Sequence, residues 1–484
     1  MRGTSVESFV QKYTEEVRQG TAAVFAGAGL SRAAGHVDWE GLLRPLARDI
    51  DLRVEREYDL ISLAQYYVND KGGRGSIDQE IVNRFSGGAE VTRSHEILAS
   101  LPIRSYWTTN YDGMIEAALE QAGKTPDVKI EPENLAVTKP RRDAVIYKMH
   151  GDVSQAHKAV ISKDDYEGYE KERGLFSINL QGDLVSKTFL FVGFSFNDPN
   201  LGLILSRIRR LLGQNRRDHY ALFKRVSRSD YTEHGEEENE REFLYQQVLE
   251  QHRVVDLKRY GIQTVFVDTY DEIPVVLQRV LDSYRRRNVF ISGAAEDYGR
   301  WSKEEALRFV HELSYGVLER ENRVLSGFGV DVGTAVINGA LSFIHGSQYR
   351  HLDEYLTLRP FPQFQTSDEP IRDSWKRYRQ DMLSESGVAL FVFGNKRLDT
   401  GEIVESEGMV EEFEVGLEHS VVPVPIGATG FASKTIWGRV MSDPAHYYGD
   451  DDALVTLVGS LGDETLTLDQ LRYQVSKTLS HLRS

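Results

Sequence analysis

Short apolar runs that end in glycine or polar residues recur along the chain. The first, TAAVFAGAGLS at 21–31, predicts a buried strand, a tight turn and then a helix. Longer segments with helical spacing of apolar residues separate the runs. Strands that alternate with helices are typical of a doubly wound parallel sheet. Five further strands are expected in the first part of the chain, at 103–108, 144–149, 188–192, 219–223 and 263–266.

The pattern restarts near residue 285. LQRVLDSYRRR at 277–287 predicts a helix that closes on a basic turn, and NVFISGAA follows as a new apolar strand with a glycine turn. We therefore expect two α/β domains, both Rossmann-like and doubly wound, at 1–284 and 285–484. In the second domain a helix is expected at 303–319, and strands at 289–291, 323–325, 388–393 and 421–426.

The charge balance argues against a nucleic-acid partner. The 484 residues include 58 Lys+Arg and 74 Asp+Glu, a formal net charge of −16. Such a charge opposes a phosphate backbone unless a basic patch is segregated. The basic clusters at 207–217 and 285–287 are short, and we interpret them as solvated helix faces.

The chain has no cysteine, so it can hold neither a disulfide nor a thiolate zinc site. No metal is expected. The N-terminal segment MRGTSVESFVQKYTEEVRQG has no secretory apolar core, and no apolar run approaches the roughly 18 residues of a membrane span. We therefore expect a cytosolic protein without a membrane partner.

Four polar motifs follow strands of the first domain. GAGLS at 27–31 has glycines that permit a tight turn and bring backbone N–H groups toward a pyrophosphate. Alone, this glycine pair is equally well explained as a packing turn between strand and helix. The others are TTNYD at 108–112, KMHGD at 148–152 and VGFSFNDPN at 192–200. Because the carboxyl ends of parallel strands converge on one crevice, the four are expected to share a ligand.

In this order the motifs resemble those of the sirtuin family, over roughly residues 10 to 280. GAGLS is similar to its GAGIS loop, TTNYD to its TQNID, KMHGD to the HG with the catalytic histidine, and VGFSF to a later glycine-serine loop. The departures matter. The family's four-cysteine zinc module cannot exist here, Thr109 and Tyr111 replace Gln and Ile, and VDWE at 37–40 only echoes PDFR. The chain thus resembles bacterial sirtuin-like NAD-hydrolysing domains of antiphage systems.

The resemblance implies NAD+ as a substrate, with no true cofactor, and cleavage of the bond between nicotinamide and ribose. Asn110 would hold the ribose hydroxyls or the attacking water, and His150 would act as general base. Asp112 would lie at the carboxamide end, with Ser195 and Asp198 on the adenosine side. A buried structural histidine is the alternative for His150. The remaining NAD+-binding residues are expected to be Gly27, Ala28, Gly29, Ser31 and Gly193.

The second domain has its own glycine turns. SGAA at 292–295 and LSGFGVDVG at 325–333 suit nucleotide phosphates or riboses. GMVEEFE at 408–414 begins a helix with acidic residues in its first turn, where they could also simply complement the helix dipole. This half resembles the nucleotide-sensing SLOG superfamily, and GMVEEFE is similar to a reduced form of its glycine-rich motif ending in glutamate.

A sirtuin-like domain followed by a SLOG domain resembles the effectors of the Thoeris antiphage defence system. The resemblance implies that a cyclic ADP-ribose isomer, made by a TIR-domain partner, binds the SLOG domain and releases NAD+ hydrolysis, in a homotetramer or a larger assembly. Arg359 and Lys376 match the basic signal contacts of the family, and cations suit phosphates. The alternative is that Arg359 and Lys376 are ordinary surface residues, because Arg372, Arg377 and Arg379 compete for that role. The remaining signal contacts are expected to be Ser292, Gly293, Gly327, Gly329, Gly408 and Glu412.

Two other functions stay open at this point. One is a protein deacylase, which the missing cysteines disfavour. The other is a non-catalytic nucleotide sensor that acts by assembly and would not require both Asn110 and His150. The helical segment expected at 230–251 carries Phe243, Leu244 and Val248, and it is either an oligomer face or a solvated helix.

Overall fold

The computed structural model describes residues 3–57, 59–87, 89–213, 215–233, 235–329, 331–346, 348, 350–361 and 370–483. Val330 of the second glycine loop and His234 of the segment at 230–251 lie outside the described residues. The chain divides into two compact units, 1–281 and 282–484. The functional boundary expected at residue 285 stays a prediction.

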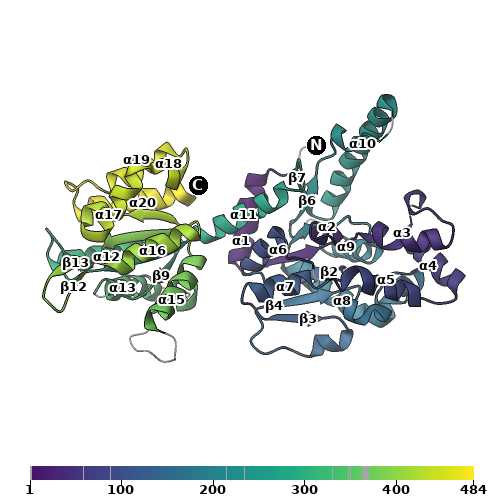
Figure 1. Ribbon diagram of the computed structural model, residues 1–484, viewed down its shortest axis with the longest axis horizontal. Helices are drawn as coiled ribbons and strands as arrows, with labels where there is room; N and C mark the ends of the chain where they lie inside the picture. Colours follow the sequence, from purple (N-terminus) through teal and green to yellow (C-terminus); the bar gives the residue numbers. More distant parts are fainter. Residues whose placement is uncertain are drawn as a thin grey trace. The chain divides into compact units, whose positions relative to one another are not determined.

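The first unit is built on a seven-stranded parallel sheet of order β3-β4-β2-β1-β5-β6-β7 (Figure 1). Apolar residues fill its central strands, and β1 and β5 are buried along their whole length. The strands are β1 Ala22–Ala26, β2 Ser105–Thr108, β3 Pro126–Lys129, β4 Ala144–Lys148, β5 Thr188–Val192, β6 His219–Lys224 and β7 Ile262–Val267.

Helices cover both faces of this sheet because side chains alternate along each strand. Ala23 and Phe25 of β1 pack in the cluster formed by α8 and α9, whereas Val24 and Ala26 face α6 and α7. The helices are α1 Val6–Arg18, α2 Ala28–Arg32, α3 Trp39–Asp49, α4 Leu60–Lys71, α5 Gly75–Phe85, α6 Arg93–Ser100, α7 Met114–Gln121, α8 Lys163–Ser186, α9 Pro199–Leu212, α10 Glu236–Arg259 and α11 Glu272–Arg285. Short 3-10 turns lie at Val54–Arg56, Pro132–Ala136, Val153–Lys158 and Arg228–Asp230.

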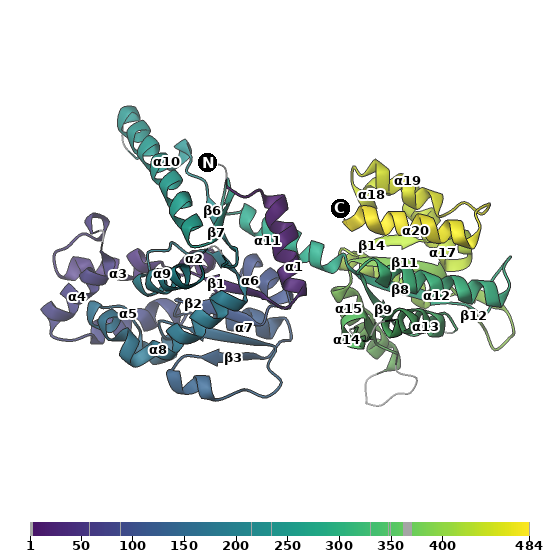
Figure 2. The same cartoon turned by 180° about the vertical axis from the view of Figure 1, so that it is seen from behind.

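The second unit has a five-stranded parallel sheet of order β10-β9-β8-β11-β14 (Figure 2). Its strands are β8 Asn288–Ala294, β9 Arg323–Ser326, β10 Leu356–Leu358, β11 Val388–Phe393 and β14 Val422–Pro425, beside an antiparallel pair of β12 Asn395–Arg397 and β13 Ile403–Glu405. Its helices are α12 Lys303–Glu319, α13 Val332–His345, α14 Leu352–Tyr355, α15 Ile371–Glu385, α16 Glu407–Glu418, α17 Phe431–Ser442, α18 Pro444–Tyr448, α19 Asp452–Ser460 and α20 Leu468–Arg483, with a 3-10 turn at Gly427–Thr429.

The expected α/β class with two doubly wound sheets is confirmed. Every strand predicted from an apolar run is present, and the predicted helix at 303–319 has these same ends. It begins at Lys303 because Ser302 and Glu305 form a capping box. Four strands were not predicted: β3 and β10, which lie at sheet edges, and the separate antiparallel pair β12 and β13. Edge strands can be polar, as PDVK of β3 is, or very short, as LTL of β10 is, so neither carries a recognisable apolar run.

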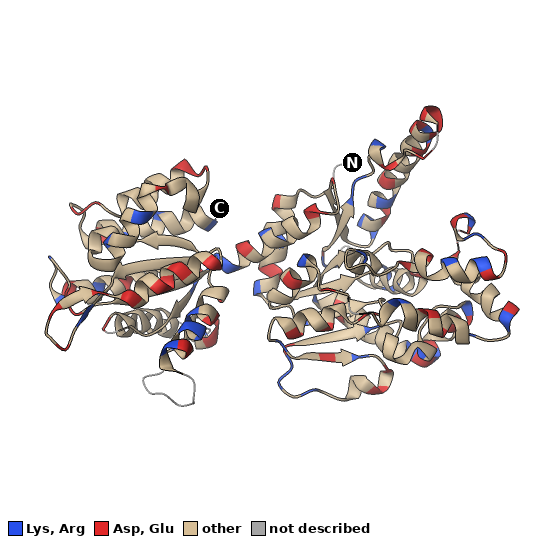
Figure 3. Ribbon diagram, in the orientation of Figure 1, with Lys and Arg blue, Asp and Glu red and all other residues tan. Residues whose placement is uncertain are grey.

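Charged residues of both signs are interspersed over each unit (Figure 3). Among the described residues, no helix is long and apolar enough to cross a membrane.

Candidate functional site

The centre of the first sheet is where its strand order reverses. On one side of β1 the sheet continues through β2, β4 and β3, and on the other side through β5, β6 and β7. Ligands of doubly wound sheets bind at the carboxyl ends of the strands at such a reversal. The four motifs of the first domain follow β1, β2, β4 and β5, so their loops border this position (Figure 1).

The loops after β1 and β5 touch backbone to backbone. The Gly27 N–H donates to the Val192 carbonyl (3.0 Å) and the Gly29 N–H to the Gly193 carbonyl (2.9 Å). A Cβ on Gly27 would lie 2.4 Å from the Gly193 oxygen, and one on Gly193, at φ +65°, would lie 2.2 Å from the Leu30 nitrogen. Close packing therefore explains these glycines. Since the amides of Gly27 and Gly29 are engaged within the fold, their role toward pyrophosphate stays a prediction.

Asn110 joins the loop after β2 to the glycine loop. Its side-chain nitrogen donates to the Gly27 carbonyl and to Ser31 Oγ, both at 3.1 Å. Its backbone N–H donates to Thr108 Oγ1 (2.9 Å). With the amide nitrogen held by two acceptors, the amide oxygen is the atom that can accept from a ribose hydroxyl or a water.

His150 and Asp198 come together from the loops after β4 and β5. His150 Nε2 lies 3.0 Å from Asp198 Oδ2, although the two are not aligned as a hydrogen bond. Asp198 also caps α9, because its Oδ1 accepts from the Leu201 N–H (2.9 Å), and Tyr166 Oη donates to Oδ2 (3.3 Å). Burial favours a higher pKa for Asp198, but the charge of His150 and the hydrogen bonds outweigh it and lower that pKa.

This pairing was missed by the sequence analysis. The sirtuin resemblance assigns Asp198 to the adenosine side, whereas the structure places its carboxylate against His150. Ser195, three residues earlier, is exposed. The available signal was the helix start at Asp198-Pro199, which predicts a capping carboxylate at the same sheet edge as the histidine.

Lys148, two residues before His150, is fully buried. Its Nζ donates to the carbonyls of Asp112 (2.5 Å) and Tyr111 (3.3 Å). It also lies 3.2 Å from Glu116 Oε1 and pairs with Asp152. Burial favours a lower pKa for Lys148, but the two carboxylates outweigh it and raise that pKa. The cluster therefore links the loop that carries Asn110 to the strand that precedes His150. In the sequence, the lysine at the end of a buried strand was the feature that could have predicted this cluster.

Asp112 is buried in the same loop. Its Oδ1 accepts from the Met114 N–H (3.1 Å). Its Oδ2 is buried and has no hydrogen-bond partner among the described residues. A buried carboxylate oxygen without a partner is costly unless a ligand or a water satisfies it. A carboxamide NH2 has the right chemistry for that acceptor.

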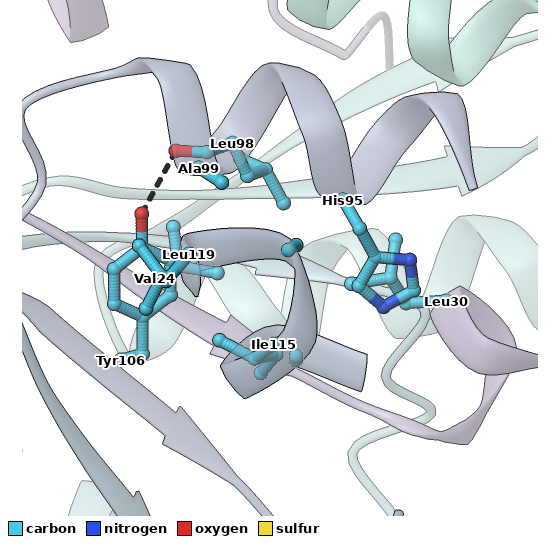
Figure 4. A pocket seen from close by; sticks show the side chains of 10 residues that line it. Val24, Leu30, His95, Leu98, Ala99, Tyr106, Ile115 and Leu119 are labelled. Atoms are coloured by element: carbon cyan, nitrogen blue, oxygen red, sulfur yellow. Dashed lines mark hydrogen bonds between the residues drawn. The ribbon is translucent and has the colours of Figure 1, made fainter. Parts of the chain in front are cut away.

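A small cavity lies between β1, α6 and α7 (Figure 4). Its free volume of about 10 Å³ is close to what one water molecule needs, and far too small for a nucleotide. His95 lines it among apolar side chains, and burial lowers the pKa of His95 to about 4. This cavity is therefore part of the core and not the ligand site.

In the second unit a similar backbone contact lies at the strand ends. The order reverses between β8 and β11. A Cβ on Gly329, after β9, would lie 2.0 Å from the Gly293 oxygen of β8, and a Cβ on Gly293 would lie 2.6 Å from Val332 Cγ1. Gly327 faces the ring of Phe361, 2.7 Å from where its Cβ would be. The structure thus brings three of the predicted glycines to one sheet edge.

Beside them, Ser292, Glu412 and Arg379 form a polar cluster. Ser292 Oγ donates to Glu412 Oε2 (2.5 Å). Arg379 Nη1 lies 2.6 Å from Glu411 Oε2, and its Nε lies 3.9 Å from Glu412 Oε1. A Cβ on Gly408 would lie 3.0 Å from Arg379 Nη2, so the glycine leaves room for the guanidinium. Burial raises the pKa of Glu412 to about 7 against the opposing effects of Ser292 and Arg379.

The two basic residues expected at the signal site are placed differently. Arg359 pairs with Glu385 (2.5 Å). Lys376 is exposed on α15, the helix that also carries Arg379. Arg379, a competitor in the sequence analysis, is the buried cation beside Glu412. Several basic residues lie close together on α15, so the sequence did not predict that Arg379 is the one whose side chain is buried.

Comparison with known proteins gives matches to both halves. A SIR2-like domain family matches residues 104–252, and the Sir2- and TIR-associating SLOG family (STALD) matches 272–482. The chain is 42% identical to NAD(+) hydrolase ThsA of Cytobacillus dafuensis over 99% of this chain and 97% of that protein. It is 44% identical to NAD(+) hydrolase ThsA of Bacillus cereus (strain MSX-D12), over 96% of each. For the protein of that name from Acinetobacter baumannii (strain 532279) the values are 42% and 91% of each.

The chain belongs to the ThsA family. Membership confirms the family expected from the two sets of motifs, and the two domain matches confirm a sirtuin-like first half and a SLOG second half. Asn110, His150 and Asp198 lie inside the SIR2-like match, and Ser292, Arg379 and Glu412 inside the SLOG match. The roles of the individual residues in ThsA chemistry stay predictions.

Proposed function

We propose that the protein hydrolyses NAD+ to nicotinamide and ADP-ribose at the crevice of its first unit. The observation that carries the proposal is that His150 lies against Asp198 after β4 and β5, while Asn110, held to the Gly27 loop, follows β2 at the same end of the sheet. A histidine backed by a carboxylate beside an oriented amide suits activation of a hydroxyl or a water. The names of the ThsA relatives support the same substrate.

In this reaction a water oxygen forms a bond to C1′ of the ribose, and the bond from C1′ to the nicotinamide nitrogen breaks. Nicotinamide leaves with the bonding electron pair and becomes neutral. His150 accepts the proton of the water and passes it to solvent. The Asp198 carboxylate, kept ionised by its lowered pKa, stabilises the imidazolium in between. Asn110 positions the water or the ribose hydroxyls through its amide oxygen.

The same proposal gives roles to the surrounding groups. Asp112 Oδ2 accepts from the carboxamide of the nicotinamide, and Ser195 lies toward the adenosine. NAD+ is the substrate, and no metal takes part in any step. Gly27, Gly29 and Gly193 pack the rim of the site, and the phosphates of NAD+ would lie over this rim beside Ala28 and Ser31.

In the second unit, we propose a site for a cyclic ADP-ribose isomer produced by a TIR-domain protein. Ser292 and Glu412 would meet ribose hydroxyls, while Arg359, Lys376 and Arg379 would supply cations for the two phosphates. Binding there releases NAD+ hydrolysis in a homo-oligomer, and the resulting loss of NAD+ serves antiphage defence. The SLOG match supports nucleotide sensing by this unit.

The test is nicotinamide release from NAD+, followed by chromatography, with and without cyclic ADP-ribose isomers. Asn110→Ala and His150→Ala should each lower the rate by about 10²-fold to 10⁴-fold, because general-base and positioning groups contribute on that scale. Asn179→Ala and His157→Ala, both exposed, are the matched controls and should retain activity. Wild-type rates in both site variants would refute the assigned site.

The other candidate functions give different outcomes in the same experiment. A deacylase would release nicotinamide only when an acylated lysine peptide is present. A non-catalytic sensor would bind NAD+ without releasing nicotinamide, and its binding would not depend on both Asn110 and His150.

A further inference from the structure

Helix α10 is attached to the first unit along a narrow face. In both views it extends beyond the sheet from its junction with β7 (Figures 1 and 2). Only Phe243 and Leu257 of its 24 residues are buried. The guanidinium of Arg228 lies 4.6 Å from the ring of Phe243 and forms hydrogen bonds with Glu240 (2.9 and 3.0 Å). The inner side of the helix is therefore fixed by a few contacts.

The outer side of α10 carries an apolar stripe. Leu244, Tyr245, Val248 and Val255 are 47%, 62%, 52% and 42% exposed. Leu244, Val248 and Val255 follow one another by four and seven residues, a spacing that puts them on one side of a helix. A run of exposed apolar residues on a single helix face marks an interaction surface.

Charge along the same helix is strongly polarised. Its first turn contains Glu236, Glu237 and Glu238, whereas its last turn contains Lys258 and Arg259, of which Arg259 also pairs with Asp256 of the same turn. The exposed apolar residues lie between these two ends of the helix. Such a helix complements itself when a second copy runs in the opposite direction, whereas a parallel copy would place like charges together.

We propose that α10 pairs antiparallel with α10 of a second copy of this chain, about a two-fold axis near Val248. Glu237 and Arg259 lie eleven residues on either side of Val248, and Glu238 and Lys258 lie ten residues on either side. Both pairs therefore oppose each other across the axis. At this axis Val248 meets Val248 of the second copy, and Leu244 and Val255 lie on the same side of the helix, opposite His252 and Arg241 of that copy. The surface gives the expected homo-oligomer a defined contact, and it does not depend on which reaction the first unit catalyses.

The absence of cysteine makes the contact easy to test. Val248→Cys, oxidised with copper phenanthroline in the full-length chain, should give a disulfide-linked band at twice the 55.0 kDa chain mass on a non-reducing gel. Ile178→Cys on α8 is the matched control, because Ile178 is 65% exposed, and should stay single. A Val248→Cys yield no higher than that of the control would overturn the proposal.

The direction of pairing is tested by mixing. Glu237→Cys and Arg259→Cys should cross-link when mixed and not when each is oxidised alone, because only an antiparallel pair brings the two positions together. Cross-linking of Glu237→Cys by itself at the level of the mixture would mean a parallel pair and would refute the proposed contact.

Light scattering tests whether the contact holds the assembly. Leu244→Glu together with Val248→Glu should halve the solution mass while circular dichroism stays the same, since both residues are exposed. Glu237→Arg should weaken the assembly, and adding Arg259→Glu should restore it, which a misfolded helix would not do. An unchanged mass in the double-Glu variant would overturn the proposal. Nicotinamide release is measured separately, so failure of this contact and failure of the proposed hydrolysis are distinguishable.

Discussion

The two units share a glycine contact at their strand ends, but the side chains next to that contact differ in chemistry. In each, a glycine after one strand packs against the backbone of a neighbouring strand end: Gly27 against Gly193 in the first, and Gly329 against Gly293 in the second. Above the first contact lie a histidine, an ionised carboxylate and an amide. Above the second lie a buried glutamate with a raised pKa, a serine and an arginine.

The backbone contact and the side chains beside it have separate roles in each unit. The glycine contact brings strand ends close enough for one ligand to meet several loops. The side chains then determine the chemistry: the first unit has a proton acceptor, and the second has cations together with groups that accept from hydroxyls. If the comparison is sound, damage to a backbone contact should disturb only its own unit, and changes to side chains should have smaller and different effects.

The largest effect is expected from Gly193→Ala and Gly329→Ala. A Cβ would lie 2.2 Å from the Leu30 nitrogen in the first variant and 2.0 Å from the Gly293 oxygen in the second. Backbone atoms cannot yield as side chains do, so each change should destabilise its unit by about 3 kcal/mol or more. Hydrogen exchange with mass spectrometry should show lost protection in the mutated unit only.

Gly182→Ala is the control for both, because Gly182 sits in α8 with nothing within 4 Å of its Cβ position. It should be neutral or slightly stabilising. Loss of protection in both units from either strained variant would contradict the view that each contact serves its own unit.

The second-largest loss of stability is expected when the buried cation of either unit is removed. Lys148→Met leaves Glu116 and Asp152 without their cation in a fully buried place, at a cost of about 3 kcal/mol. Arg379→Met should cost less, because its main partner Glu411 is 61% exposed and remains solvated. Urea unfolding of the full chain measures both. An equal or larger loss for Arg379→Met would reverse this ranking.

Two buried carboxyl groups, Glu412 in the second unit and Asp198 in the first, should respond to pH in opposite directions. The folded pKa of Glu412 is about 7, above its ordinary value of 4.5. Its contribution is therefore fully present below pH 4.5 and is lost as pH rises through 7, by about 3 kcal/mol in total. Asp198, with a lowered pKa, contributes above its ordinary value of 3.8 and loses its contribution as pH falls through the folded value.

Calorimetry between pH 5 and pH 8 tests the Glu412 part. Glu412→Gln keeps an acceptor for Ser292 and cannot ionise, so it should remove the decline of the second unit's unfolding temperature with rising pH. A variant with the same pH profile as the wild type would show that another group causes the decline.

The sequence predicted the sheets well because apolar runs report buried strands directly. It placed the candidate residues on the correct strand ends for the same reason, since polar residues after such runs are visible in the chain. It could not predict that Asp198 meets His150, or that Arg379 turns inward while Lys376 stays exposed. Those outcomes depend on which side of α9 and of α15 packs against the sheet. The sequence does not determine this, because charged residues occur on several neighbouring turns of each segment.

The smallest effect on stability, and the sharpest one on function, is expected for Lys376→Ala. Lys376 is exposed, so its loss should change the free energy of unfolding by no more than about 0.5 kcal/mol. A phosphate-bearing signal needs cations, and a signal can activate only by binding the active arrangement more tightly than the inactive one. Lys376→Ala and Arg359→Ala should therefore lose the calorimetric titration with a cyclic ADP-ribose isomer while NAD+ binding at the first unit survives. Undiminished signal binding would leave Arg379 as the cation that matters, and loss of both titrations would mean that these residues support the fold.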